Sequence, residues 1–108
     1  MLYSLSEQLL RAARQPGPAR IHDSWSSTDW RGIADRVALM AGALRQLGVA
    51  PGDRVAVLGA NSIDYLCLYF AIPWAGAISV PVNTRLAPAE IIEQLEDSQS
   101  TVLLLDAD

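Results

Sequence analysis

The stretch "YLCLYFAIPWAGAISVPVNTRL", Tyr65–Leu86, decides how this chain folds, because its first twenty residues carry no charge. A helix of that length is long enough to cross a bilayer. However, Pro73, Gly76 and Pro81 interrupt it, and a proline disfavours helix at the preceding residue. No asymmetry of Lys or Arg flanks it to orient an insertion. We therefore predict a buried helix ending near Trp74 and then a buried strand, both central in a layered α/β core.

The segments on either side of this stretch are further apolar strands and helices. The run "RVAVLG" begins at Arg54 and the run "TVLLLD" begins at Thr101, and both are typical of strands buried on two faces. Helices are predicted from about Ser62 to Trp74, with Asn61 or Ser62 as the cap, and from about Pro88 to Asp97. The order from Arg54 onward is β-α-β-α-β. It indicates an α/β fold with three layers and a mainly parallel sheet joined by right-handed crossovers.

The N-terminal half is predicted to be a helix, a small hairpin and a long helix. The first helix runs from about Tyr3 to Gln15 and is ended by "QPGP", and the hairpin strands lie in "ARIHD" and "SSTDW". The long helix runs from about Trp30 to Leu47, with Asp29 as its N-cap and Gly48 as its terminator. Its apolar stripe follows helical spacing and comprises Ile33, Val37, Met40, Leu44 and Leu47.

Composition restricts the class of protein. The chain has 108 residues, of which 51% are hydrophobic and 19% charged, so it is one small domain or a piece of a larger one. The net charge is −4 and all eight basic residues are scattered arginines, which argues against nucleic-acid binding. A single cysteine, Cys67, allows no intramolecular disulfide, and the N-terminus lacks the regions of a signal peptide. We therefore expect a cytoplasmic protein.

Three features were weighed as candidate sites. "LGANS", Leu58–Ser62, joins a strand to a helix N-terminus, where free N–H groups bind anions, but it matches no glycine-rich phosphate motif and a simple helix cap is favoured. His22 has no recognisable nucleophile or carboxylate arrangement around it, so a surface or half-buried role is favoured over a catalytic base. Cys67 lies among apolar residues in a predicted helix, where a buried thiol should be inert.

The aromatic and acidic side chains also have ordinary explanations. For the tryptophans, packing or covering the hairpin is favoured over a ligand platform; they are Trp25, Trp30 and Trp74. A solvated acidic helix face is favoured over an acid/base pair for Glu90, Glu93, Glu96 and Asp97. Asp106 follows an apolar strand, as a phosphoacceptor would, but the sequence ends two residues later. No metal-ligand spacing occurs, and we assign no catalytic, cofactor-binding or metal-binding residue.

Several strings together resemble the N-terminal part of the AMP-forming acyl-CoA synthetases of the adenylate-forming superfamily. "STDWRGIADRV" stands where that family usually has Leu-Thr-Tyr-x-Glu-Leu, and "WAGAISVPVN" matches its Ala-Gly-x-x-x-x-Pro-hydrophobic-Asn segment. "GDRVAVLGANSIDY" and "VNTRLAPAEIIEQLEDS" add to the match, and the resemblance covers about Leu5 to Asp108. Two positions depart from the pattern. Gly32 replaces the usual Glu, which removes a capping box, and Ala87 replaces a capping Thr or Ser.

The resemblance implies a function for a longer protein. In the family, a carboxylic acid and ATP give an acyl-adenylate, and CoA then displaces AMP, with Mg²⁺ as the metal. The family's phosphate loop, nucleotide-binding acids and catalytic Lys come later in the chain, and this sequence contains no Lys. We therefore expect residues 1–108 to be a single N-terminal subdomain, inactive alone, whose partner is the rest of the enzyme. "PVNTRL" favours a fatty acid as substrate.

A second interpretation remains open beside this one. The excess of apolar residues and the expected open edge of the sheet also fit a free-standing module that self-associates, for example as a homodimer, or binds a partner. A small nucleotide-binding domain of the flavodoxin type is a third and weaker interpretation.

Overall fold

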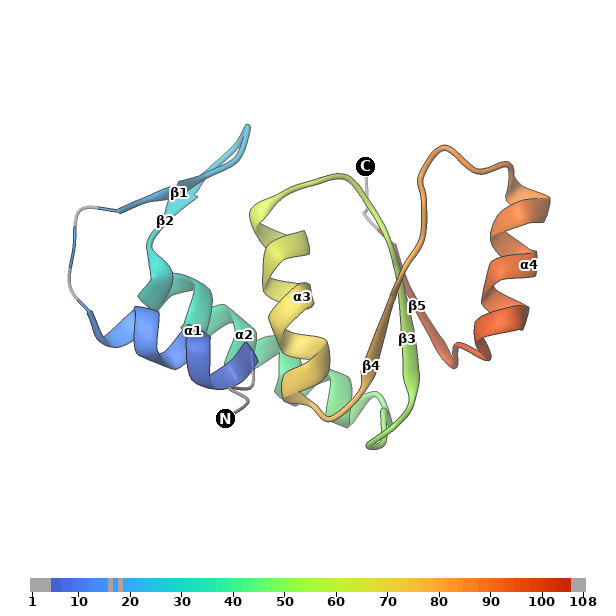
Figure 1. The fold of residues 1–108 in the computed structure, drawn as a ribbon, viewed down its shortest axis with the longest axis horizontal. Coiled ribbons are helices and arrows are strands. Elements are labelled where there is room, and N and C mark those ends of the chain that lie inside the picture. The colour runs from blue at the N-terminus through green and yellow to red at the C-terminus, as the bar shows by residue number, and fades with distance from the viewer. Residues whose placement is uncertain (1–4, 16, 18, 106–108) are drawn as a thin grey trace.

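The computed structural model describes residues 5–15, 17 and 19–105 (Figure 1). Tyr3, Pro16, Pro18 and Asp106, on which parts of the predictions rest, lie outside these residues. The described chain forms, in order, α1 (Leu5–Arg14), β1 (Ile21–His22), β2 (Ser27–Thr28), α2 (Trp30–Gln46), β3 (Arg54–Leu58), α3 (Ile63–Trp74), β4 (Ile78–Pro81), α4 (Pro88–Ser98) and β5 (Val102–Leu105).

The main sheet has three parallel strands in the order β4-β3-β5. Ala56 at the centre of β3 is aligned with Val80 of β4 and with Leu103 of β5. Figure 1 shows α1, α2 and α3 on one face of this sheet and α4 on the other. The predicted three-layer α/β fold with β-α-β-α-β order is therefore confirmed. Each parallel pairing needs a crossover, and α3 and α4 supply the two crossovers.

The prediction that all three strands are buried on both faces is wrong for two of them. Among the described strands, only β3 has a hydrogen-bonded neighbour on each side, and its Val55 and Ala56 are fully buried. In β4, Ile78 is 49% exposed, and in β5, Leu105 is 64% exposed. An apolar run indicates a strand of a parallel sheet but does not reveal its place in the strand order, which depends on where the chain returns.

The uncharged stretch divides as predicted into a helix and a strand. Helix α3 passes through Pro73 and ends at Trp74, and Gly76 then turns the chain with a φ of +85°, which disfavours side chains. The carbonyl of Gly76 accepts a hydrogen bond of 2.8 Å from the N–H of Gly52, which ties this turn to the one before β3. Within the described chain, no helix is long and apolar enough to cross a membrane. The expectation that the strand of this stretch is central is wrong, because β4 is an edge strand.

Helix α2 begins where the sequence predicts, but its buried face is turned slightly. Asp29 caps it by accepting a 2.9 Å hydrogen bond from the N–H of Gly32. Its fully buried side chains are Ile33, Val37, Ala41 and Leu44. Met40 is only half-buried and Leu47, beyond the last turn, is 68% exposed. Because α2 packs against both α1 and α3, its buried face is directed toward Ala41 instead of Met40.

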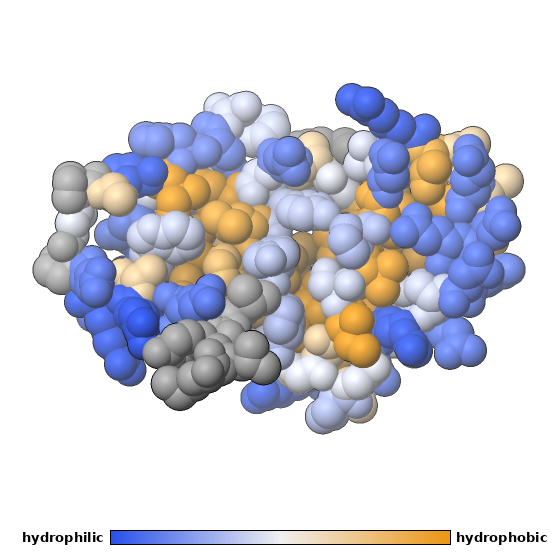
Figure 2. Space-filling model, in the orientation of Figure 1, coloured by the Kyte–Doolittle hydropathy of each residue, from blue (hydrophilic) through white to orange (hydrophobic). Residues whose placement is uncertain are grey.

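The hydrophobic core lies between the three helices of one layer and the sheet. Its largest fully buried side chains are Leu9, Ile33, Ile63, Ile72, Val37, Val55 and Cys67. Helix α4, in contrast, has no buried residue among those described, and Ile92 is 57% exposed. Figure 2 accordingly shows apolar residues reaching the surface between hydrophilic ones. The two faces of the sheet are therefore covered unequally.

Candidate functional site

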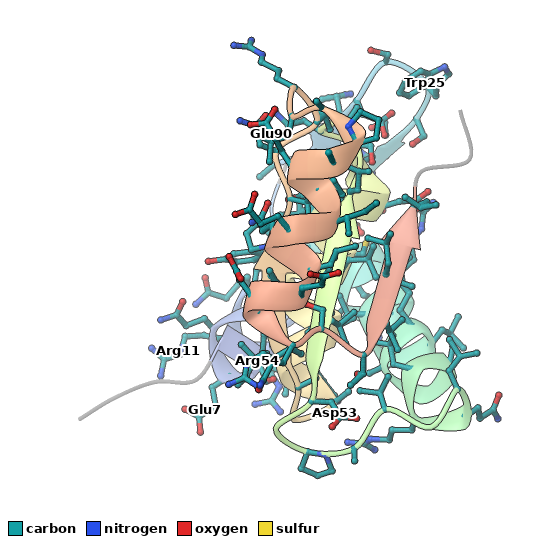
Figure 3. All side chains as sticks on the ribbon, turned by 90° about the vertical axis from the view of Figure 1, so that its right-hand side faces the viewer. Glu7, Arg11, Trp25, Asp53, Arg54 and Glu90 are labelled. Atoms are coloured by element: carbon teal, nitrogen blue, oxygen red, sulfur yellow. The ribbon has the colours of Figure 1, made fainter. Side chains whose placement is uncertain are left out.

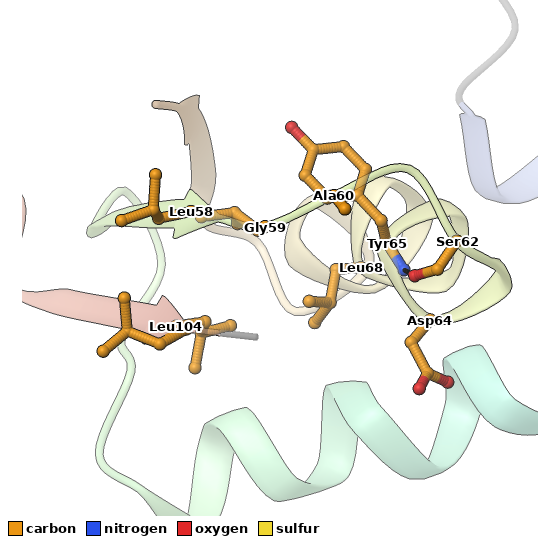
Figure 4. Close-up of a pocket in the computed structure, with 10 residues that line it drawn as sticks. Leu58, Gly59, Ala60, Ser62, Asp64, Tyr65, Leu68 and Leu104 are labelled. Atoms are coloured by element: carbon orange, nitrogen blue, oxygen red, sulfur yellow. Dashed lines mark hydrogen bonds between the residues drawn. The ribbon is translucent and has the colours of Figure 1, made fainter. Parts of the chain in front are cut away.

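A cavity lies at the carboxyl ends of β3 and β5, beside the N-terminus of α3 (Figure 4). Its volume is about 290 Å³. Its walls are the end of β3, the loop that leads into α3, the first turns of that helix and the end of β5; they comprise Val57, Leu58, Gly59, Ala60, Ser62, Asp64, Tyr65, Leu68, Leu104 and Leu105. Most of these side chains are apolar, and the ionisable ones are Asp64 and Tyr65. Among the described lining residues, the hydroxyl of Ser62 accepts a hydrogen bond from the N–H of Tyr65 and is not paired with a base.

The cavity lies at the edge of the sheet where α/β proteins bind ligands. Strand β3 leads to α3 on one face of the sheet and β4 leads to α4 on the other, so the direction of winding reverses between β3 and β4, whereas the cavity lies on the β5 side of β3. A smaller hollow of about 140 Å³ lies on the β4 side, and Val57, Tyr65 and Leu68 line both spaces. These three side chains, of which Tyr65 is the largest, therefore lie between the two hollows, a placement that the apolar sequence did not reveal.

The N-terminus of α3 is closed by the protein's own side chains. The hydroxyl of Ser62 accepts a 3.1 Å hydrogen bond from the N–H of Tyr65, and a carboxylate oxygen of Asp23 accepts one of 2.9 Å from the N–H of Ile63. Two of the donors that a helix start leaves free are thus occupied. The charge of Asp64 in the same turn opposes an anion. The helix-cap interpretation of "LGANS" is supported over the anion site, with Ser62 as the cap.

Asp23 is the residue that the sequence analysis missed. It lies in the turn between β1 and β2 and accepts hydrogen bonds from the N–H groups of Trp25 and Ser26 as well as from Ile63. The bond from Ile63, followed by those from Trp25 and Ser26, lowers the pKa of Asp23 from 3.8 to about 2. An Asp in a short polar segment is typical of a local turn, because its side chain accepts a hydrogen bond from the backbone two residues later. Nothing in the sequence signals the contact with Ile63, forty positions away.

Neither the lone histidine nor the lone cysteine belongs to the lining of this cavity. His22 is exposed on β1. Cys67 is fully buried in α3, and burial raises the pKa of its thiol above the ordinary value; the charge of Arg36 has a smaller lowering effect and that of Asp64 a smaller raising effect. A buried thiol with a raised pKa is a poor nucleophile. The prediction of an inert Cys67 agrees with this placement.

The tryptophans and the acidic helix are also placed by the structure. Trp30 and Trp74 are half-buried against the core, whereas Trp25 is 76% exposed, so it covers nothing and its predicted packing role is wrong. The carboxylates of α4 are all exposed, which supports the solvated face; they are Glu90, Glu93, Glu96 and Asp97. Glu90 also accepts a 3.1 Å hydrogen bond from the N–H of Ala87, so half of a capping box persists without a capping side chain. Among the described residues, no group of His, Cys, Asp or Glu is arranged to hold a metal ion.

Known proteins resemble this chain in both sequence and fold. The model of the AMP-binding enzyme family matches residues 10–108. A feruloyl-CoA synthase of an Amycolatopsis species is 40% identical over 94 residues, which is 87% of this chain and 19% of that protein. A long-chain-fatty-acid–CoA ligase of Mycobacterium tuberculosis is 46% identical over 67 residues, which is 62% of this chain and 13% of that protein.

A solved structure shows the same architecture. The benzoate CoA ligase of Burkholderia xenovorans superposes with a TM-score of 0.86 at 25% identity, and the match covers 94% of this chain and 21% of that one. The chain thus spans about a fifth of the length of the relatives that it matches. Since the family model matches nearly every residue after the first nine, the chain belongs to the AMP-binding enzyme family.

Proposed function

We propose that this chain is the N-terminal subdomain, residues 1–108, of an AMP-forming acyl-CoA ligase, and that it is the scaffold of that enzyme. The observation that carries the proposal is the family match over residues 10–108 together with the small share, 13–19%, of each relative's length that the chain covers. The lining of the cavity supports the scaffold role, because Asp64 and Tyr65 are the only ionisable groups among its described residues.

The longer protein would form an acyl-CoA in two steps. A carboxylic acid attacks ATP to give an acyl-adenylate and pyrophosphate, and the thiol of CoA then displaces AMP. ATP, Mg²⁺ and CoA would bind to residues outside this chain. One relative is a CoA ligase and the other a CoA synthase, which supports this reaction class. The 46% identity to the long-chain-fatty-acid–CoA ligase favours a fatty acid as substrate.

The rest of the enzyme would be the partner of this subdomain. Strand β5 has a neighbour on one side only, and its Leu103 and Leu105 are 36% and 64% exposed. Fully burying a leucine is worth about 1.5–3 kcal/mol. Docking of the remaining domain on this side of the sheet would bury both side chains and supply the binding energy that holds the two parts together.

The first experiment measures ATP–pyrophosphate exchange by the purified 108-residue chain with fatty and aryl acids. We expect no exchange above background, and turnover by the chain alone would refute the scaffold role.

A chimera extends this test. Residues 10–108 replace the matching segment of the Amycolatopsis feruloyl-CoA synthase, and feruloyl-CoA formation is measured.

We expect the chimera to stay active and to keep ferulate as its preferred acid, because a scaffold does not contact the substrate and so does not determine specificity. A folded chimera that is inactive, or one that prefers a different acid, would contradict the proposal. The matched control carries Val55→Asp, which buries an unpaired charge in β3, the central strand, and should abolish folding of the chimera.

A second candidate function is self-association of the free chain. Its support is the exposed apolar surface, with Ile78 beside one free edge of the sheet and Leu105 beside the other. Sedimentation equilibrium separates the two candidates. A dimer that dissociates when Leu105 is replaced by Glu supports self-association, and a monomer at high concentration contradicts it.

A further inference from the structure

The β1–β2 hairpin has few contacts of its own to hold it. Each strand is two residues long, and Ile21 pairs with Thr28 while His22 pairs with Ser27. Ile21 packs against the core, but Trp25 near the tip is 76% exposed and points away from the body of the molecule in Figure 3. An isolated hairpin of this size is not stable in water. Its position therefore depends on a connection to the rest of the protein.

One carboxylate makes such a connection. Oδ1 of Asp23 accepts hydrogen bonds from the N–H groups of Trp25, at 2.8 Å, and Ser26, at 2.7 Å, which closes the turn. Oδ2 of the same side chain accepts a 2.9 Å hydrogen bond from the N–H of Ile63, the first residue of α3. The two oxygens thus join a surface turn to a helix that begins forty residues later.

The charge of Asp23 suits this position. Hydrogen bonds from backbone N–H groups to a carboxylate are shorter and stronger than those between neutral groups, and a negative charge is favourable at a helix N-terminus. The carboxylate that belongs to the first turn of α3 itself, that of Asp64, instead forms a 3.6 Å ion pair with Arg36 of α2. Because these hydrogen bonds lower the pKa of Asp23 to about 2, its side chain stays charged at pH values where an ordinary carboxyl is already protonated.

The hydrogen bond between Asp23 and Ile63 lies next to a loop that forms one wall of the cavity. The loop of residues 59–62 ends at Ile63, and Gly59, Ala60 and Ser62 line the cavity at the carboxyl ends of the strands. A second hollow of about 400 Å³ lies between this loop and the hairpin, lined in part by Asp23, Asn61 and Ile63. We propose that Asp23 is a latch that fastens the hairpin to the first turn of α3 and so holds the 59–62 loop, one wall of the cavity, in place.

Amide hydrogen exchange, followed by NMR, tests the latch in the unaltered chain. Ile63 and Asp64 are neighbours in the first turn, but the structure records a hydrogen bond for the N–H of Ile63 and none for that of Asp64 among the described residues. After correction for intrinsic rates, the amide of Ile63 should exchange about tenfold more slowly than that of Asp64, as expected for one hydrogen bond. Equal rates would overturn the proposal without any variant.

Two variants separate the latch from the turn. In Asp23→Asn, one oxygen remains to accept from the turn while the amide nitrogen cannot accept from Ile63, so the exchange of Ile63 should rise and that of Ser26 should stay near wild type. In Asp23→Ala, the amides of Ile63, Ser26 and the 59–62 loop should all exchange faster. The amide of Val55, which is fully buried in the central strand β3, reports global opening, and its exchange rate should not change together with theirs.

Asp53→Asn is the matched control. Asp53 is also a turn carboxylate and accepts a 2.8 Å hydrogen bond from the N–H of Ala50, three residues away. This variant should alter exchange near Ala50 and leave Ile63 and the 59–62 loop unchanged. Folded Asp23→Ala protein with wild-type exchange in the loop, or an equal effect of Asp53→Asn on Ile63, would refute the latch.

Discussion

Two glycines of α2 should respond in opposite ways to the same substitution. Gly42 lies in the interior of the helix and is exposed, and a Cβ built on it meets no heavy atom within 4 Å. Glycine in the middle of a helix costs roughly 0.5–1 kcal/mol relative to alanine, chiefly through backbone entropy. Gly42→Ala should therefore raise the free energy of unfolding by about 0.5–1 kcal/mol. In a domain of this size, each kcal/mol raises the Tm by about 4–8 °C.

Gly32 is the third residue of the same helix, but its surroundings differ. A Cβ at this position would collide with the hydroxyl oxygen of Thr28. That hydroxyl makes only a long hydrogen bond of 3.5 Å, to the carbonyl of Asp29, so the side chain has to rotate or the helix start has to shift. Gly32→Ala should therefore raise the free energy of unfolding by less than Gly42→Ala does, or should lower it. Removing the hydroxyl in Thr28→Ala/Gly32→Ala should restore the gain.

Thermal and urea unfolding followed by circular dichroism measures both effects. A double-mutant cycle over Thr28 and Gly32 should give a coupling of at least about 0.5 kcal/mol, as is usual for residues in contact. The cycle over Thr28 and Gly42 is the control and should be additive. If Gly42→Ala does not stabilise the chain, or if Gly32→Ala stabilises it equally and additively with Thr28→Ala, the reasoning is refuted.

Three further outcomes are expected. Ile72→Ala, at a fully buried position, should lower the free energy of unfolding by about 2–5 kcal/mol, and Ile92→Ala, at a position 57% exposed, by less than about 0.5 kcal/mol in the same urea titration. Because the pKa of Asp23 is lowered from 3.8 to about 2, its contribution to stability is present above a pH of about 4 and is lost as the pH falls through 2. The stabilities of wild type and Asp23→Asn should thus converge over that interval, and a constant difference would contradict this. Cys67 should react with an alkylating reagent far more slowly in the folded chain than in urea, and equal rates would show that its thiol is accessible.

The helices could be predicted from the sequence because their signals are local. Asp29 and Ser62 cap α2 and α3 through N–H groups three residues away, and Gly76 ends the turn after α3 with a positive φ. These interactions form between residues that are close in the chain, so a pattern of residue types is sufficient to locate them. The order of strands and helices, and the parallel sheet, follow from the same patterns.

The strand positions and the role of Trp25 could not be predicted in this way. The apolar runs of β4 and β5 resemble that of β3, yet only β3 has neighbours on both sides. The apolar composition of a strand reports the environment of a parallel sheet and not the number of its neighbours. Trp25 is apolar and aromatic, but it lies near the tip of a two-residue hairpin, beyond the reach of the core.

By itself, the sequence determined the elements, their order, the three-layer class and the family, because each depends on periodicity, caps and strings of neighbouring residues. The tertiary structure decided that β3 is central, that Tyr65 lines two hollows, and that the carboxylate of Asp23 accepts a hydrogen bond from the N–H of Ile63. These features join residues that are far apart in the chain. They exist only once the crossovers have brought the carboxyl ends of the strands, the start of α3 and the hairpin to the same edge of the sheet.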